Sequence, residues 1–357
     1  MAKQSLFSAC KRVFRDGISG TYTVGNNDIF LELYSQQDID RNNEIGNSSE
    51  ENIVVVAGDT ITIPEGYTLT PVKPKKSLVV ICNTFVNNGT ISMYQKAPNV
   101  LPHDLFIIEK NEFDGNKDII IPAYANNQVS RALDYNSKVN GANGTNRQCG
   151  SGGLGSAARR YWPMTSGSGY AFGGGAGTGG ILGYYEGSYI IDSTYPMRGG
   201  SAEKDNGALY SGGVGNPTGL GYTDPKVPNY DQDFGCGGRI IIFCYNFTNN
   251  GNITVNGTSC KVILGKTSED MNKGIAFGGA SGGGAVDLFY TNKITEGTIT
   301  ATGGSGLSNS GNGGDGSITL TPWLKSSVLK PIAKYMSKEN MVYFLTNYIQ
   351  RLKQGED

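Results

Sequence analysis

The chain has 357 residues, with 30 Lys and Arg against 31 Asp and Glu, 53 glycines and His103 as its single histidine. Charged residues make up 17 % of the chain against the usual ~25 %, so no basic surface for nucleic acid is indicated. No apolar run approaches the ~18 residues of a membrane helix. One histidine argues against two-histidine metal centres and most histidine-relay hydrolases. We therefore expect no metal and no cofactor.

The N-terminal part, residues 1–70, alternates apolar and polar residues in a period of two, which predicts strands. The expected strands are Thr21–Val24, Ile29–Leu33, Ile53–Val56 and Thr60–Ile63. They would form a small sandwich or the first turns of a solenoid, and this part could attach the protein to a larger particle. Eight acids and one base lie between Asp28 and Thr60, which favours a solvated loop over a docking or cation site.

An internal repeat is the clearest signal in the chain. Residues 78–92 (LVVICNTFVNNGTIS), 240–254 (IIIFCYNFTNNGNIT) and 286–300 (VDLFYTNKITEGTIT) each contain an apolar run, a turn with glycine and a short Thr/Ser-Ile strand. The β-branched apolar run predicts a strand that is covered on both faces. Cys82 and Cys244 fall at the same repeat position, which predicts a buried role for both.

Each repeat therefore predicts one β-turn-β unit, and we expect Gly251 and Gly297 to occupy turn positions with positive φ. Units that bury their apolar faces only against neighbours indicate a stacked architecture. The predicted fold class is mainly β, a β-solenoid or stacked β-sheet architecture, with first rungs at 71–139 and further repeats at 239–321.

A Gly-rich insertion separates the first two repeats, at residues 140–238. Aromatic residues are interleaved with its glycines, whereas a disordered linker is expected to be poor in aromatics. An ordered Gly-rich segment needs close backbone packing, because glycine loses the most backbone entropy on folding. We expect glycine strands packed side by side with aromatics at the bends.

In the C-terminal part, residues 322–357, the stretch from Leu324 to Lys353 contains no glycine. Met341, Leu345, Tyr348 and Leu352 recur at helical spacing, which predicts a short helical segment. Its apolar stripe would cover the end of the stack or bind a partner.

The six cysteines show no C-x-x-C spacing and are expected to be buried free thiols in a reducing cytoplasm.

Signals for catalysis are few. Asp224, Asp231 and Asp233 lie near tyrosines and could supply the carboxylate pair of a glycosidase. Gly-x-Gly-x-x-Gly matches arise by chance in so Gly-rich a chain, and a calcium repeat would need aspartate where Ser308 stands. We expect a protein that is not an enzyme.

Binding is better supported, because Tyr and Trp provide large rigid contact areas with a hydrogen-bonding group. Sugar rings present apolar faces that stack on such side chains. Most of these aromatics would shield glycine backbone from water, and a minority at loop tips would suffice for recognition. The candidate ligand-binding residues are Tyr161, Trp162, Tyr184, Tyr185, Tyr189, Tyr210, Tyr222 and Tyr230.

Residues 235–257 (GCGGRIIIFCYNFTNNGNITVNG) and the later segment GGASGGGAVDLFYTNKITEGTITATGGSG resemble the Gly-rich repeats of bacteriophage tail-fibre and adhesin proteins. The resemblance covers about residues 235–320, with a weaker match at 78–92. It implies a virion fibre or receptor-binding protein whose partners are other virion proteins and a host surface glycan. Without a signal peptide, assembly in the host cytoplasm and residence in the virion are expected.

The function expected from sequence is therefore a non-enzymatic phage receptor-binding protein, a homo-oligomer that recognises a host carbohydrate through the Gly/Tyr insertion. One alternative is a structural tail, collar or capsid-decorating component without a receptor. A less favoured alternative is a polysaccharide-degrading tailspike.

Overall fold

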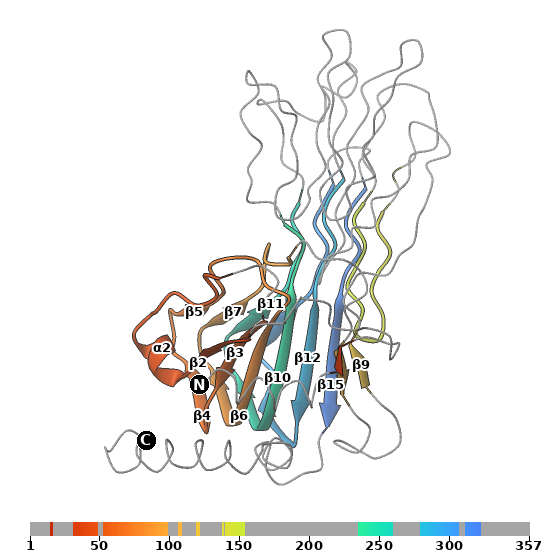
Figure 1. Cartoon of the computed structure of the whole chain (residues 1–357). Coiled ribbons are helices and arrows are strands. Elements are labelled where there is room, and N and C mark those ends of the chain that lie inside the picture. Colours follow the sequence, from red (N-terminus) through yellow and green to blue (C-terminus); the bar gives the residue numbers. More distant parts are fainter. Residues whose placement is uncertain are drawn as a thin grey trace, which may run out of the picture.

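The computed structural model describes residues 15–16, 31–48, 53–98, 106–108, 119–121, 138, 140–153, 235–259, 279–306 and 311–322. Within these ranges the protein is mainly β, as the sequence predicts, with two parallel sheets (Figure 1). The described helix is α2 (Gln36–Asp40), which begins with a capping box between Ser35 and Asp38. No described helix is long and apolar enough to cross a membrane.

The larger sheet has the order β15-β12-β10-β6-β3-β2, and all neighbours are parallel. Two shorter strands extend it, since β4 pairs with the second half of β6 and β13 with that of β10. The bounds are β2 (Leu31–Tyr34), β3 (Ile53–Ala57), β4 (Thr60–Ile63), β6 (Ser77–Asn87), β10 (Arg239–Asn249), β12 (Ala285–Tyr290), β13 (Asn292–Thr295) and β15 (Ser317–Pro322).

The second sheet has four short parallel strands in the order β14-β11-β7-β5. Their bounds are β5 (Thr68–Leu69), β7 (Thr90–Ser92), β11 (Asn252–Thr254) and β14 (Thr298–Thr300). A separate antiparallel sheet joins β1 (Arg15–Asp16), β8 (Phe106–Ile108) and β9 (Ile119–Ile121).

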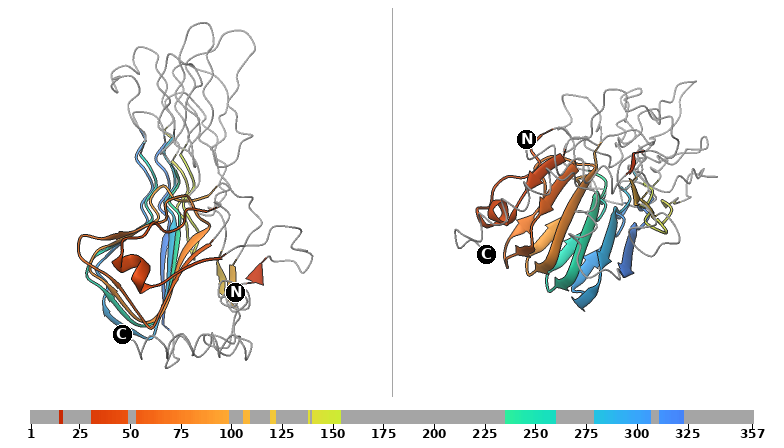
Figure 2. Two further views of the ribbon diagram at one scale, coloured as in Figure 1. Left: turned by 60° about the vertical axis from the view of Figure 1, so that its left-hand side comes forward. Right: turned by 60° about the horizontal axis from the view of Figure 1, so that its bottom comes forward.

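The sequence repeat is the structural repeat. Each copy places its apolar run in the larger sheet and its Thr/Ser-Ile strand in the second sheet, so β6–β7, β10–β11 and β12–β14 stack in register. Cys82 lies directly opposite Cys244, and both thiols are fully buried as predicted. In the left view of Figure 2 the successive units lie one behind another. The residues between the first two copies, 93–239, are thus inserted into a continuous pair of sheets.

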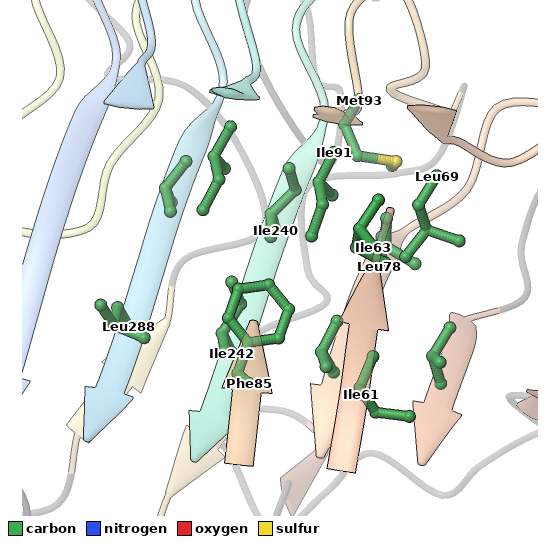
Figure 3. Packing of buried hydrophobic residues seen from close by; sticks show 14 of the residues in the cluster. Ile61, Ile63, Leu69, Leu78, Phe85, Ile91, Met93, Ile240, Ile242 and Leu288 are labelled. Carbon is green, nitrogen blue, oxygen red and sulfur yellow. The ribbon is translucent and has the colours of Figure 1, made fainter. Parts of the chain in front are cut away.

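The apolar core lies between the two sheets. Leu78, Ile240, Ile242 and Leu288 point into it from the larger sheet, and Ile91 faces them from the second (Figure 3). Burial of each such side chain contributes about 1.5–3 kcal/mol. The central strand β10 is buried on both faces from Arg239 to Cys244, which confirms the prediction from its continuous apolar run.

Of the two turn glycines that were expected to have a positive φ, Gly251 and Gly297, only one does. Gly297 has a φ of +57°, as predicted, but Gly251 lies outside the left-handed region, so that prediction was wrong. Glycine is required at 251 for a different reason. A Cβ there would collide with the carbonyl oxygen of Gly89 and lie 3.0 Å from the carbonyl carbon of Asn88 in the preceding unit. Close stacking of turns, rather than dihedral freedom, explains this glycine.

Other expected elements lie outside the described residues. These are the strand at 21–24, most of the insertion at 154–234 and the C-terminal helical segment beyond residue 322. The expected boundary at residue 70 falls between β5 and β6, and both belong to the same stacked sheets.

Candidate functional site: a glycine lattice

Glycine-rich segments continue the strands beyond the end of the larger sheet. The segments 235–238, 279–284 and 311–316 lead into β10, β12 and β15, while 255–259 and 301–306 follow β11 and β14. Two further segments, 140–144 and 149–153, lie beside them. Figure 1 shows the described parts running side by side away from the sheets. We call these seven segments the glycine lattice.

Backbone hydrogen bonds between the segments 140–144 and 311–316 of the lattice recur every three residues. The N–H of Gly141 donates to Asn312 O at 2.8 Å, and three residues later Gly144 donates to Asp315 O at 2.7 Å. In a β-strand, bonds to the same neighbour recur every two residues, because side chains and backbone groups alternate. A repeat of three on both segments is the geometry of a polyproline II-type helix, which has no internal hydrogen bonds.

Hydrogen bonds then leave each segment in several directions. The segment 279–284 exchanges backbone hydrogen bonds with five others, whereas a strand in a sheet has at most two neighbours. For example, Gly283 donates to Gly314 O at 2.9 Å and accepts from Gly150 N at 2.8 Å. Its five partners are 149–153, 235–238, 255–259, 301–306 and 311–316. The result is a three-dimensional network instead of a sheet.

Glycine is required in the lattice because no space exists for a Cβ atom. A Cβ on Gly283 would lie 2.9 Å from the Gly316 nitrogen, 2.7 Å from the Ala301 carbonyl carbon and nearer still to its oxygen. A Cβ on Gly314 would meet the backbone of Ala142 and Asn143 in the same way. None of these lattice glycines has a positive φ, so close approach of backbones explains their abundance.

Polar side chains satisfy backbone groups at the outside of the lattice. The N–H of Thr302 donates to Asn256 Oδ1 and that of Ser305 donates to Ser259 Oγ, each at 2.9 Å. The N–H of Asp315 likewise donates to Asn143 Oδ1 at 2.9 Å. Such acceptors recur every third residue, in the pairs Asn140 and Asn143, Asn256 and Ser259, and Asn312 and Asp315. This period is visible in the sequence and could have revealed the lattice.

A buried ion cluster fixes the lattice to the larger sheet. Asp287 on β12 is fully buried and accepts from Arg239 at 2.9 Å and from Arg147 at 2.7 Å. The Arg147 guanidinium also donates to Thr321 Oγ1 at 2.6 Å and lies 5.0 Å from the centre of the Phe289 ring. Since Arg147 lies between the segments 140–144 and 149–153, these contacts hold both segments against the sheet.

The lattice brings together the ends of three chain segments. The N–H of Gly153 donates to Ala280 O at 2.8 Å, and the N–H of Ala280 donates to Gly311 O at 3.0 Å. On the other side Thr258 Oγ1 donates to Gly235 O at 2.7 Å. The described residues that flank the segments 154–234, 260–278 and 307–310 therefore lie together at one end of the lattice.

All eight aromatic residues predicted to bind a ligand lie in the first of these segments, outside the described residues. The same holds for Asp224, Asp231 and Asp233. The structure describes the residues that flank that segment, which belong to the glycine lattice. The lattice residues themselves were not predicted as part of a site.

A second, largely buried ion pair joins Lys75 to Glu32 on β2. Lys75 is fully buried and donates to Glu32 Oε1 at 2.6 Å, while Ser48 and Tyr34 also donate to this carboxylate. Burial raises the pKa of Glu32, but these hydrogen bonds and the Lys75 charge outweigh it, so the net shift is downward. In the described part of the chain, no three His, Cys, Asp or Glu side chains come together as a metal site.

The four described cysteines, Cys82, Cys149, Cys236 and Cys244, are free and buried. Burial raises the pKa of each thiol, to about 11 for Cys149. A thiol with so high a pKa is a poor nucleophile at neutral pH. These cysteines act as small packing residues.

Comparison of the chain with protein-family models, with curated proteins and with solved structures finds no match.

Proposed function

We propose that this chain is a non-enzymatic phage virion protein, a fibre or receptor-binding protein that recognises a host surface carbohydrate. In this proposal the stacked units form an elongated, oligomeric β-solenoid, and the Gly/Tyr segment 154–234 is the recognition element. The observation that carries the proposal is the convergence of three segment ends on the glycine lattice.

The lattice supports a presenting role because its interior offers only backbone. Glycines that admit no Cβ cannot supply catalytic or binding side chains. The lattice, whose folding costs much backbone entropy, therefore serves as a rigid hydrogen-bonded base. A rigid base reduces the conformational entropy that a recognition loop loses on binding. Chemistry for recognition then has to come from the segments that the base carries.

The composition of 154–234 fits this role. Its tyrosines and Trp162 provide aromatic faces for stacking and hydroxyl or indole groups for hydrogen bonds. In the described part of the chain the buried carboxylates of Asp287 and Glu32 are bound to arginine or lysine.

A triple variant, Tyr184→Ala, Tyr185→Ala and Tyr189→Ala, tests the proposal. Adsorption of the purified protein to host cells should be lost, while the melting temperature stays close to wild type, because exposed truncations change stability by at most ~0.5 kcal/mol. Tyr67→Ala is the matched control, since Tyr67 is 39 % exposed and lies in the stacked units. It should leave adsorption unchanged.

Two results would contradict the proposal. If the triple variant loses several kcal/mol of stability before any adsorption is lost, these tyrosines cover the glycine backbone. If antibody to residues 160–230 decorates particles without affecting adsorption, the structural virion component becomes the better assignment. Electron microscopy of the labelled particle would then locate the chain.

A further inference from the structure

The outer face of the second sheet carries two columns of uncharged polar side chains. Thr68, Thr90, Asn252 and Thr298 occupy equivalent positions on β5, β7, β11 and β14 and form the first column. Ser92, Thr254 and Thr300 form the second. The intervening Leu69, Ile91 and Ile253 are buried in the core, so the columns lie on the opposite face. We call these seven residues the hydroxyl face.

The geometry of the hydroxyl face follows from the stacked repeat. Neighbouring strands are ~4.8 Å apart and alternate residues ~6.6 Å apart, so the seven side chains occupy a regular grid. All seven are partly or fully exposed, and Thr300 Oγ1 donates to Thr254 Oγ1 at 3.1 Å. Tyr94, 40 % exposed, follows Ser92 and donates its N–H to Ser92 Oγ at 3.2 Å.

The chemistry of this face selects among partners. Neither column contains Lys or Arg, so the face offers no cation to phosphate groups, and neither contains a large apolar side chain that could insert into a lipid surface. Hydroxyl and amide groups can both donate and accept, which suits a ligand that is itself covered with hydroxyls. Equal spacing along the stack suits a ligand built of repeating units.

We propose that the hydroxyl face binds a neutral linear polysaccharide, which lies along the columns and across the strands. The site is separate from the segment 154–234 and does not depend on the role proposed for it. Because the side chains are already in register, each additional unit of the polymer would meet an equivalent group. Affinity should therefore rise with chain length.

The test is binding of the full chain to a printed array of neutral bacterial O-antigen polysaccharides, with heparin as the charged comparison. The variant Thr254→Val with Thr300→Val removes two hydroxyls and keeps β-branched side chains suited to a strand. It should bind at least tenfold more weakly, as should Asn252→Val. Thr60→Val, at an exposed position of β4 in the larger sheet, is the matched control and should bind like wild type.

Equal binding by the Thr254/Thr300 variant and wild type would overturn the proposal, as would heparin binding in place of the neutral glycans. Inhibition of ice growth without glycan binding would also overturn it and assign the grid to ordered water. The tyrosine triple variant keeps array binding if the hydroxyl face is the site. Failure of either proposal can thus be distinguished from failure of the other.

Discussion

Replacement of Gly283 by alanine isolates the requirement for close backbone approach in the glycine lattice. Gly283 lies outside the left-handed region, so alanine can adopt its backbone conformation without strain. The new Cβ, however, would stand 2.7 Å from the Ala301 carbonyl carbon and 2.9 Å from the Gly316 nitrogen. Real Cβ atoms essentially never approach within 3.0 Å of such atoms, so at least one neighbouring segment must move.

The expected loss is about 2–6 kcal/mol. Overpacking of a well-packed interior costs about 1–3 kcal/mol. Movement also weakens the two backbone hydrogen bonds of Gly283, to Gly314 and from Gly150, each of which contributes about 0.5–1.5 kcal/mol. Gly58→Ala is the matched control, because its nearest neighbour is the terminal carbon of the Ile61 side chain at 3.1 Å. That substitution should change stability by less than ~1 kcal/mol.

Thermal unfolding and amide hydrogen exchange would measure the two effects. Gly283→Ala should lower the melting temperature and accelerate exchange at the N–H groups of Gly150 and Gly283, while Gly58→Ala leaves both near wild type. An unchanged melting temperature with unchanged exchange at these amides would refute the argument that backbone contact requires these glycines.

Three further predictions concern the stacked units. Gly251→Val and Gly297→Val should each destabilise the protein by more than ~1 kcal/mol in chemical unfolding. At both positions the new side chain would collide with the preceding turn, and at 297 the positive φ adds backbone strain. Unfolding midpoints equal to that of the wild type would contradict this. Asp287→Asn should lower the free energy of unfolding by about 3–5 kcal/mol, because two arginines lose their buried counter-charge. A loss below ~1 kcal/mol in the same assay would show that the ion cluster is not needed for stability. The lowered pKa of Glu32 stabilises the fold above its unfolded-state pKa, and this contribution is lost as pH falls through the lower folded pKa. Acid titration of Glu32→Gln should therefore show a flatter stability profile than wild type, and parallel profiles would contradict the assignment.

The repeat, the parallel stacking and the burial of β10 could be predicted because they are encoded locally. Alternating or continuous β-branched residues determine which faces of a strand are apolar. The apolar run and the turn have the same length in each copy, so equivalent residues such as Cys82 and Cys244 align. The interleaved aromatics that predicted an ordered insertion lie in 154–234, outside the described residues, so that prediction stays untested. These features depend on residues close together in the chain.

The neighbours of each glycine segment were decided only by the tertiary structure. Gly283 shows why: its run Gly282–Gly284 carries no side chains whose pattern could identify a partner. Its hydrogen-bond partners Gly150 and Gly314 come from distant parts of the chain, and Asp287 meets Arg147 across 140 positions. The same holds for Gly251, whose requirement comes from the turn of another unit stacked on it. Backbone contacts between segments depend on how the sheets stack, and only the folded chain sets those distances.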